Sequence, residues 1–277
     1  MAAVFSLLLL LEAIRPLRRR KRALGPRLAL NLCLSATVFA AGGYVVRPVA
    51  LWGATWAGDR AFGLLHLLPV PFWAQFICGF LLMDLTFYYW HRLNHTRALL
   101  WRFHNVHHVD PDLDVSTSFR FHLGEILYST GFRILQVCLL GIAPLTYVIY
   151  ELVFQGATMF HHTNLKLPIR LERLLNKVVV TPRMHGVHHS VIGQETNSNY
   201  SVIFSWWDRM HRSLRLNVGQ ADLIIGVPGY LLPEDNRFFS LLKFPFLRQR
   251  PYWRWPSGKA SVRKAVAETT DLGLMVE

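Results

Sequence analysis

The hydrophobic residues of this chain form long runs without charges, unlike the short amphipathic patterns of soluble domains. Residues 28–46 are 19 consecutive positions without Asp, Glu, Lys or Arg, and residues 61–83 are 23 such positions. A helix needs about 20 apolar residues to cross the hydrocarbon core of a bilayer. Both runs therefore predict membrane-spanning helices. Pro69 and Pro71 place the start of the second helix near Pro71, because proline fits the first turn of a helix better than its interior.

A third apolar stretch covers residues 134–160 and is interrupted in its middle. The sequence Gly-Ile-Ala-Pro at residues 141–144 breaks a helix, and Glu151 adds a charge further on. We expect either a hairpin of two segments within residues 125–160 or a pair of short helices that do not both cross the bilayer.

The N-terminal residues combine an apolar segment with a basic cluster that follows it, formed by Arg15 and residues 18–22. A secretory signal peptide carries its basic residues ahead of the apolar core, so this order does not fit one. Basic residues beside a spanning helix stay on the cytoplasmic side. Residues 1–27 are therefore interpreted as an apolar segment and a topology determinant, with residues 15–27 in the cytoplasm.

The domain organisation predicted from the sequence is simple. No internal repeat or low-complexity segment divides residues 28–255, which are expected to form one membrane-embedded domain. Residues 256–277 lack the aromatic content of the body of the chain, and we expect them to be a loosely ordered C-terminal tail.

The composition also indicates a membrane protein. Hydrophobic residues make up 52% of the chain and charged residues only 17%, which is unusual for a soluble domain of 277 residues. The net charge of +13 could indicate nucleic-acid binding, but Arg and Lys crowd the segments between and after the apolar runs, where they would face anionic lipid headgroups. No nucleic-acid partner is expected. The three cysteines lie in apolar stretches without metal-ligand spacing, and we expect them to be small buried residues.

Histidines carry the candidate chemistry. Of thirteen in the chain, ten fall into the four groups HRLNH, HNVHH, FHHTN and HGVHH. Helical residues three or four apart share a face, so each spaced group could aim several ring nitrogens at one point. Neutral imidazole binds iron, zinc, copper and nickel, and this number of ligands exceeds what one ion can hold, so two ions are expected. The candidate ligands are His91, His95, His104, His107, His108, His161, His162, His185, His188 and His189.

The remaining histidines fit this pattern less well. His161 adjoins His162, and neighbouring helical residues point about 100° apart, so one of the two is expected to support the site or simply to be packed. The sequence does not decide whether His122 is a metal ligand or a residue that supports a ligand. His66 and His211 fit no group and are expected to be structural.

The predicted topology brings the four groups to one side of the membrane. Residues 28–46 leave the cytoplasm, residues 71–90 return to it, and a hairpin through residues 125–160 begins and ends on that same face. The sequence thus predicts an all-α, integral-membrane helical bundle with a cytoplasmic, histidine-rich di-metal centre.

Several segments between about residues 80 and 210 carry a family resemblance. They read DLTFYYWHRLNH, LWRFHNVHHVD, STSFRFH, HHTNLKLP, TPRMHGVHHS, ETNSNYS and SWWDRM, in that order. The sequence resembles the fatty acid hydroxylase/sterol desaturase superfamily of integral-membrane, histidine-rich di-iron proteins. This resemblance implies a di-metal oxygenase acting on a lipid, without fixing which lipid. One departure is WWDRMHRSLR, where the family often continues from WDR into Phe-Gly-Thr.

The ligand set favours iron. Attack on an unactivated C–H bond with dioxygen needs a redox metal, so two ferrous ions suit the reaction and zinc does not. Hydroxylation and desaturation both remain open, because the outcome depends on how the substrate carbon is held. No flavin, haem or iron–sulfur motif is present, so we expect a separate electron donor, a ferredoxin or a small haem protein with its reductase.

Three other classes of protein remain as alternatives. A membrane di-zinc hydrolase could use the same imidazoles to activate water, and a bis-haem electron carrier could use them as axial ligands. The third alternative is a non-catalytic metal-binding membrane protein. A hydrolase also needs a general base beside the metal, and no carboxylate lies within any histidine group.

Polar residues outside these groups are candidates for orienting the imidazoles. Asp84, Tyr88, His91 and His95 form one helical stripe, and Asp84 follows a long apolar run where an unpaired carboxylate would be costly. We expect Asp84 to contact an imidazole of the 161–162 or 185–189 group; pairing with a nearby arginine is the alternative. Further candidates of the same kind are Asn164, Asn199 and Glu125.

Overall fold

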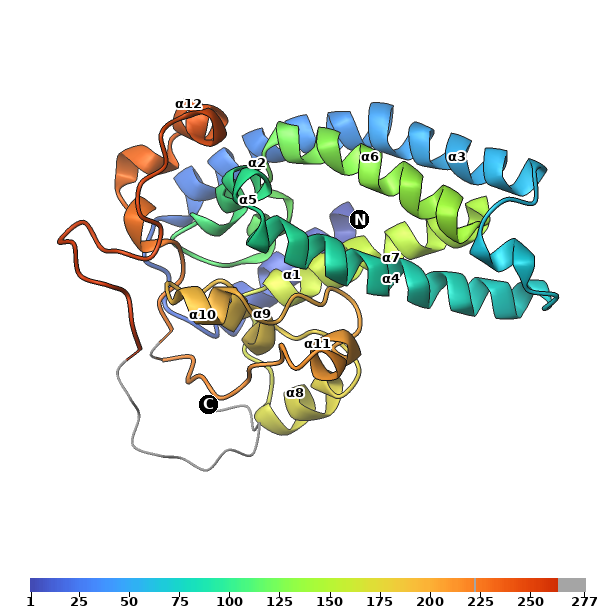
Figure 1. Cartoon of the computed structure of the whole chain (residues 1–277). Helices are drawn as coiled ribbons and strands as arrows, with labels where there is room; N and C mark the ends of the chain where they lie inside the picture. Colours follow the sequence, from blue (N-terminus) through green and yellow to red (C-terminus); the bar gives the residue numbers. More distant parts are fainter. Residues whose placement is uncertain (222, 264–277) are drawn as a thin grey trace.

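A computed structural model describes residues 1–221 and 223–263 of the chain, and in this part every named element is a helix. Within it, β-structure is limited to isolated bridges such as that between Val179 and Phe204. The predicted all-α fold is confirmed. Four long rods run side by side, formed by α2 to α3, α4, α6 and α7, and the short helices gather toward one end of them (Figure 1).

The helices differ greatly in length, and only a few could cross a bilayer. The α-helices are α1 (Ala2–Ile14), α2 (Leu24–Ala41), α3 (Arg47–Asp59), α4 (Phe72–Thr96), α5 (Ala98–His108), α6 (Leu123–Leu140), α7 (Pro144–His162), α8 (Ile169–Asn176), α9 (Pro182–His188), α10 (Gly193–Thr196), α11 (Trp206–Met210) and α12 (Phe238–Lys243). A π-helical segment, η1 (Gly42–Val46), joins α2 to α3, and short 3₁₀ turns are η2 (Leu64–Leu67), η3 (Val115–Phe119), η4 (Pro228–Tyr230), η5 (Pro233–Asn236) and η6 (Phe244–Phe246).

Three helical segments of the described chain are long and apolar enough to span a membrane: Leu24–Leu67, Phe72–Thr96 and Leu123–Leu140. The first contains the uncharged run 28–46 but continues past it, because the π-helical turn carries the helix on into α3 instead of ending it. The second begins as predicted, with Pro71 in an extended conformation immediately before α4.

The interrupted third stretch forms a hairpin of α6 and α7, one of the two arrangements that the sequence leaves open, and of the two helices α6 alone is a candidate span within the described chain. Gly141 ends α6 with φ 71°, a left-handed conformation that favours glycine, and Pro144 opens α7. Gly63 packs against this turn so closely that a Cβ on it would lie 2.4 Å from the backbone nitrogen of Gly141. The turn between α6 and α7 is thereby fixed to the segment that joins α3 to α4.

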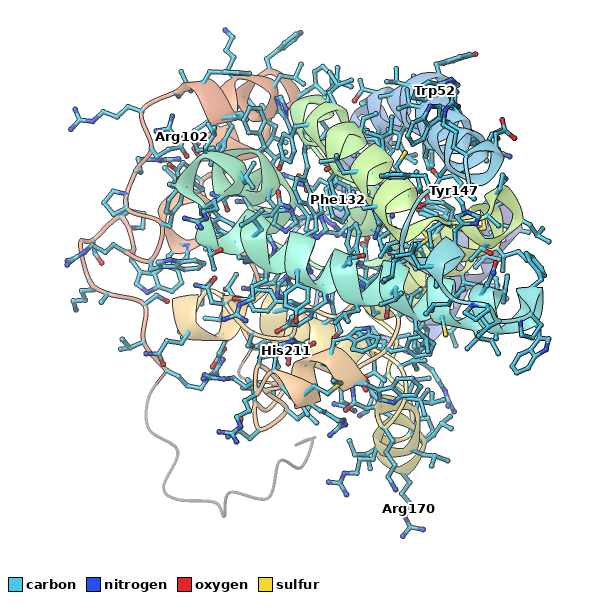
Figure 2. All side chains as sticks on the ribbon, turned by 45° about the vertical axis from the view of Figure 1, so that its right-hand side comes forward. Trp52, Arg102, Phe132, Tyr147, Arg170 and His211 are labelled. Atoms are coloured by element: carbon cyan, nitrogen blue, oxygen red, sulfur yellow. The ribbon has the colours of Figure 1, made fainter. Side chains whose placement is uncertain are left out.

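Large apolar side chains cover the outside of the long helices. Trp52 is 62% exposed and lies on the outer face of α3 (Figure 2). Cys33 and Cys78 are exposed and Cys138 is partly so; the expectation that all three are buried is wrong, because helices that face lipid also carry apolar residues on their outer surface. Arg170, by contrast, extends outward from the short helix α8 (Figure 2).

The N-terminal segment packs against the body of the molecule. The carboxylate of Glu12, fully buried, accepts hydrogen bonds from the backbone N–H groups of Val115 (3.1 Å) and Asn164 (2.8 Å). Arg27 is also buried and pairs with Asp110 (2.9 Å) and Asp114. These contacts tie residues 1–27 to the loops that flank the histidines. Within the expected tail, residues 264–277 lie outside the described part of the chain, and the domain division at residues 28 and 255 stays a prediction.

Candidate metal centre

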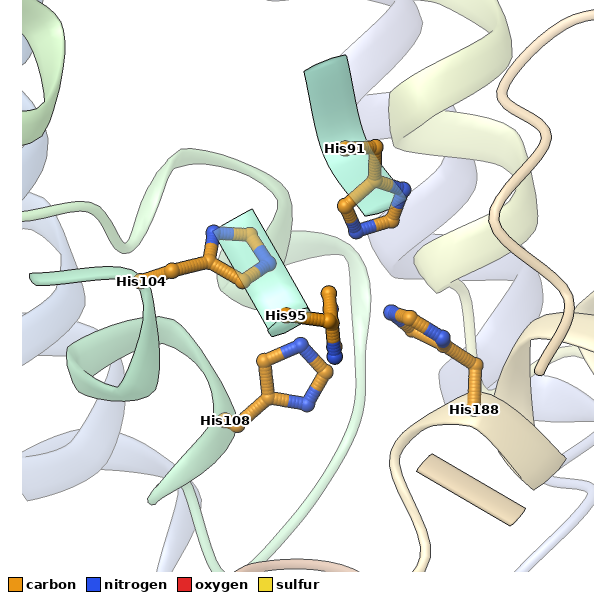
Figure 3. A group of neighbouring side chains, drawn as sticks. All are labelled: His91, His95, His104, His108 and His188. Atoms are coloured by element: carbon orange, nitrogen blue, oxygen red, sulfur yellow. The ribbon is translucent and has the colours of Figure 1, made fainter. Parts of the chain in front are cut away.

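Five histidines from three helices surround one space. His91 and His95 come from α4, His104 and His108 from α5, and His188 from α9 (Figure 3). All five are buried, and one nitrogen of each lies within 4.8 Å of the corresponding nitrogen of every other. The spacing His-x-x-x-His on α4 and on α5 places two imidazoles one turn apart on each helix, which is why so few segments supply so many donors.

A second group of four buried histidines, His107, His162, His185 and His189, converges in the same way. The Nε2 atom of His162 lies 3.0 Å from those of His107 and His185, and the Nε2 atoms of His185 and His189 are 3.1 Å apart. Ligands held at about 2.0–2.1 Å by one ion lie about 2.9 Å apart in octahedral and about 3.3 Å apart in tetrahedral coordination. The observed separations fit four imidazoles around one ion.

The two groups adjoin each other. The rings of His108 and His189, one from each group, stack at a centroid distance of 4.3 Å, and those of His188 and His185, again one from each group, stack at 5.0 Å. The HNVHH and HGVHH motifs thus meet in one cluster, as their spacing predicts. Adjacent residues on α5, His107 and His108, point into different groups, which follows from their separation of about 100° around the helix.

Hydrogen bonds at the outer nitrogens orient several of these rings. The Nδ1 atoms of His91 and His188 lie 2.7 Å from the carbonyl oxygens of Tyr200 and Ser198, and each such contact leaves Nε2 directed into its group. His162 makes the same kind of contact within α7. The Nδ1 atom of His104 lies 2.8 Å from a carboxylate oxygen of Glu125, so the candidate Glu125 does contact an imidazole. Such contacts fix the tautomer and raise the basicity of a ligating nitrogen.

The protonation state of the cluster suits metal binding. Burial lowers the pKa of His188 to about 3, and burial also lowers the pKa of His107, His108, His185 and His189 well below the usual range for histidine. These five imidazoles are therefore neutral at physiological pH, with lone pairs free to bind a cation. Both ring nitrogens of His95 and His108 and the Nε2 atoms of His104 and His188 are buried without a hydrogen-bond partner in the described chain. A bound metal would satisfy such nitrogens.

A short segment, residues 198–204, supplies the carbonyls that hold three histidines. Besides His188 and His91, His161 is held there, with its Nδ1 3.2 Å from the oxygen of Val202. Two buried carboxylates fix the segment through its N–H groups. Asp208 accepts hydrogen bonds from Tyr200 (2.9 Å) and Ser201 (2.8 Å).

The second of these carboxylates is Asp84. It accepts hydrogen bonds from the backbone N–H groups of Ile203 (3.4 Å) and Phe204 (3.0 Å) and from the indole N–H of Trp207 (2.7 Å). The expected contact with an imidazole of the 161–162 or 185–189 group is wrong, because the backbone donors of this segment occupy both carboxylate oxygens. Asp84 reaches the histidines only through the segment that holds them.

Replacing Asp208 by Asn is expected to weaken metal binding about 10-fold. This is the lower end of the loss in affinity that is typical when a group supporting the metal ligands is replaced. The amide would turn an N–H₂ group toward the N–H of Tyr200 or Ser201, displacing the carbonyls that orient His91 and His188. Metal content after dialysis against a graded chelator measures the change. Asp59→Asn, at an exposed residue that ends α3, is the matched control. Equal metal retention in both variants would show that Asp208 does not support the site.

The other candidates from the sequence lie around the cluster. Asn164 exchanges hydrogen bonds with the backbone of Arg18, and Asn199 bridges the backbone of Met184 and Arg215, so neither side chain bonds to an imidazole. The predicted roles of Asn164 and Asn199 in supporting the site stay predictions. His161 lies outside both groups, although its ring is 4.1 Å from that of His185.

The three histidines outside the four sequence groups, His66, His122 and His211, make contacts away from the cluster. His122 caps α6, accepting from Gly124 N–H, and its Nε2 lies 3.0 Å from the oxygen of Leu242. His211 stacks on Tyr88, while the ring of His66 packs beside Gly141. All three therefore have structural partners.

An elongated cavity of about 550 Å³ leads from the cluster into the bundle. Five histidines line one end of it: His91, His104, His107, His161 and His185. Most of its remaining wall is apolar and comes from α2, α4, α6 and α7, including Phe87, Phe132 and Phe154. Phe132, labelled in Figure 2, stacks its ring on that of Trp90 of α4 at a centroid distance of 4.5 Å. A volume of this size can hold a small molecule or the body of a lipid.

Comparisons with known proteins agree with this arrangement. Residues 76–213 match the model of the fatty acid hydroxylase family. The chain is 29% identical over 182 residues to ornithine lipid hydroxylase from Rhizobium tropici, covering 65% of this chain and 52% of that protein. It is 30% identical to human cholesterol 25-hydroxylase (49% of each chain), and 31% identical to alkylglycerol monooxygenase from Danio rerio (68% of this chain, 41% of that protein).

Two further findings concern the extent of the matches and the solved structures. The matches span about half the length of the curated relatives. No solved structure matches the chain significantly. Together with the three candidate spans, the relatives identify an integral membrane protein.

Proposed function

Because this chain belongs to the fatty acid hydroxylase superfamily, we propose that it is a membrane di-iron oxygenase that hydroxylates or desaturates a lipid C–H bond. It would use dioxygen and electrons from a separate donor. The observation that carries this proposal is the position of two adjoining groups of buried histidines at the end of an apolar cavity inside a membrane bundle. A lipid chain can reach such a centre without leaving an apolar environment.

Nine histidines would hold the two ions, five in the first group and four in the second. Bound iron would supply the reduction of dioxygen and the oxidant for the C–H bond, which amino-acid side chains cannot provide. The protein itself contributes orientation and exclusion of water. Glu125 and the carbonyls of Ser198 and Tyr200 hold imidazoles in place, and the apolar cavity wall positions the substrate carbon beside them.

We place the histidine centre on the cytoplasmic face. The support is the basic cluster at residues 18–22, which adjoins the first candidate span and is tied by Arg18 to Asn164, two residues after His162. The electrons would come from a ferredoxin or a small haem protein with its reductase, and the net charge of +13 suits an acidic donor.

Comparative lipid profiling tests the function directly. Cells that express the chain are expected to contain a lipid 16 mass units heavier, or 2 units lighter, than a lipid of cells that lack it. Cells expressing His188→Ala at equal membrane abundance are the control and should lack the new species. Unchanged profiles from cells with an iron-loaded protein would argue against an oxygenase. A new lipid in the His188→Ala cells as well would exclude this centre as its source.

A further inference from the structure

The end of the cavity opposite the histidines contains charged residues in the middle of the bundle. Arg133 of α6 and Glu151 of α7 both line it, and Nη2 of Arg133 lies 2.9 Å from Oε1 of Glu151. Arg133 is buried, with its guanidinium 5.7 Å from the ring centres of Phe87 and Tyr150. Charges at such a depth in a membrane protein are costly and usually serve a ligand or a pathway.

This pair has hydrogen-bonding capacity left. Oε1 of Glu151 is buried, and its contact with Arg133 lacks the alignment of a hydrogen bond. A guanidinium offers five N–H donors and a carboxylate only acceptors. Nη1 of Arg133 already donates to Oε1 of Gln136, which leaves further N–H groups of this guanidinium for a ligand. A group that both accepts and donates, such as a hydroxyl, could therefore bond to Arg133 and Glu151 at once. A carboxylate ligand would instead meet the negative charge of Glu151.

The distance between the two ends of the cavity can be read along the helices. One face of α7 lines the cavity from Glu151 through Gln155 and Thr158 to His161, and on α6 the lining runs from Arg133 to Glu125. At 1.5 Å per helical residue these separations are about 15 Å and about 12 Å. An extended chain advances about 1.2 Å per bond, so the gap corresponds to about 10 to 12 bonds.

The cavity also has an open side. Phe39, Gly43 and Arg47, around η1, and Leu152 of α7 line it and are exposed. A Cβ at Gly42 or Gly43 would meet no atom within 4 Å, so the wall is thin at this point. Because these residues lie within or beside candidate spans, an amphiphile could enter sideways from the bilayer.

We propose that Arg133 and Glu151 bind the hydroxyl group of an amphiphilic substrate and so place a carbon about 10 to 12 bonds away at the histidine centre. The inference rests on the proposed function for the identity of the reacting end. It makes the substrate an alcohol with an apolar body, and it sets the position of oxidation by counting from the hydroxyl.

Photo-cross-linking tests this orientation without requiring turnover or metal. The probes are 16-carbon primary alcohols with a diazirine at carbon 3 or at carbon 11, added to the full-length protein in lipid nanodiscs. The carbon-3 probe is expected to label peptides containing residues 129–133 or 147–152, and the carbon-11 probe those containing residues 91–94 or 158–161. The same labelling site for both probes, the reverse order, or no saturable labelling of the cavity would overturn the proposal.

Two comparisons test whether the hydroxyl group of the probe is what the protein recognises. The methyl ether of the carbon-3 probe cannot donate a hydrogen bond, and we expect it to label the 147–152 region about 10-fold less, as loss of a hydrogen bond to a charged acceptor predicts. Glu151→Gln should reduce labelling by the alcohol to a similar degree, with Glu234→Gln, at an exposed residue of η5, as the matched control. Equal labelling by alcohol and ether in the unaltered protein would refute hydroxyl recognition even if Glu151→Gln misfolds. Correct probe order with no new lipid in the profiling experiment would contradict the proposed function alone.

Discussion

Replacement of His107 or His188 by Ala is expected to lower product formation at least about 100-fold. Losses at residues that merely orient a ligand already reach 10- to 100-fold, and these two imidazoles point into the groups themselves. His188 belongs to the five-histidine group and His107 to the four-histidine group, so each variant disturbs one ion position. Product formation per molecule of membrane-inserted protein is the measurement.

Membrane insertion should be unaffected, because the apolar spans drive it and neither histidine lies within one. His211→Gln is the matched control: this ring contacts Tyr89 and Trp207 and belongs to neither group. Turnover retained in either alanine variant would remove that histidine from the metal centre. Loss of turnover in the His211 variant would extend the site to the 207–211 turn.

Oxidation of the lipid should stop completely without dioxygen. In cells incubated under ¹⁸O₂, a hydroxylated product is expected to carry one ¹⁸O atom, because one oxygen atom enters the C–H bond and the other leaves as water with two electrons and two protons. A desaturated product would carry no label but would lack two hydrogens and would form only when dioxygen is present. Mass spectrometry of the product found by lipid profiling measures both.

The label also separates oxygenase from hydrolase. A di-zinc hydrolase would take oxygen from water and would work without dioxygen. The structure makes this control necessary, since Glu125 lines the cavity beside His104 with one carboxylate oxygen free of hydrogen bonds. A product labelled from H₂¹⁸O, or formed under nitrogen, would exclude the proposed oxygenase.

Much of the metal centre could be predicted from the sequence because its donors are regularly spaced. His91 and His95 must share a face of α4, and His185, His188 and His189 are brought together within one short helix and its end, whatever the rest of the fold does. The break between α6 and α7 was equally predictable, since Gly141 and Pro144 have strong backbone preferences of their own.

The support of the centre could not be predicted in the same way. The carbonyls of Ser198, Tyr200 and Val202 hold three histidines. Every residue has a backbone carbonyl, so the amino-acid sequence does not indicate which carbonyls make such contacts. Asp84 was recognised as a buried carboxylate, yet its partners lie more than 110 residues away, and only the fold brings Ile203 and Phe204 to it. The pairing of Arg133 with Glu151 likewise depends on the crossing of α6 and α7.

The central claim is that the two histidine groups hold two iron ions. Quantification of metals in the full-length protein, purified in mild detergent without chelators or a histidine tag, tests it most directly. We expect two irons per chain, an absorption spectrum without a haem Soret band, and loss of iron in the His107→Ala and His188→Ala variants. Two zinc ions per chain without iron, or one haem in place of free iron, would contradict it.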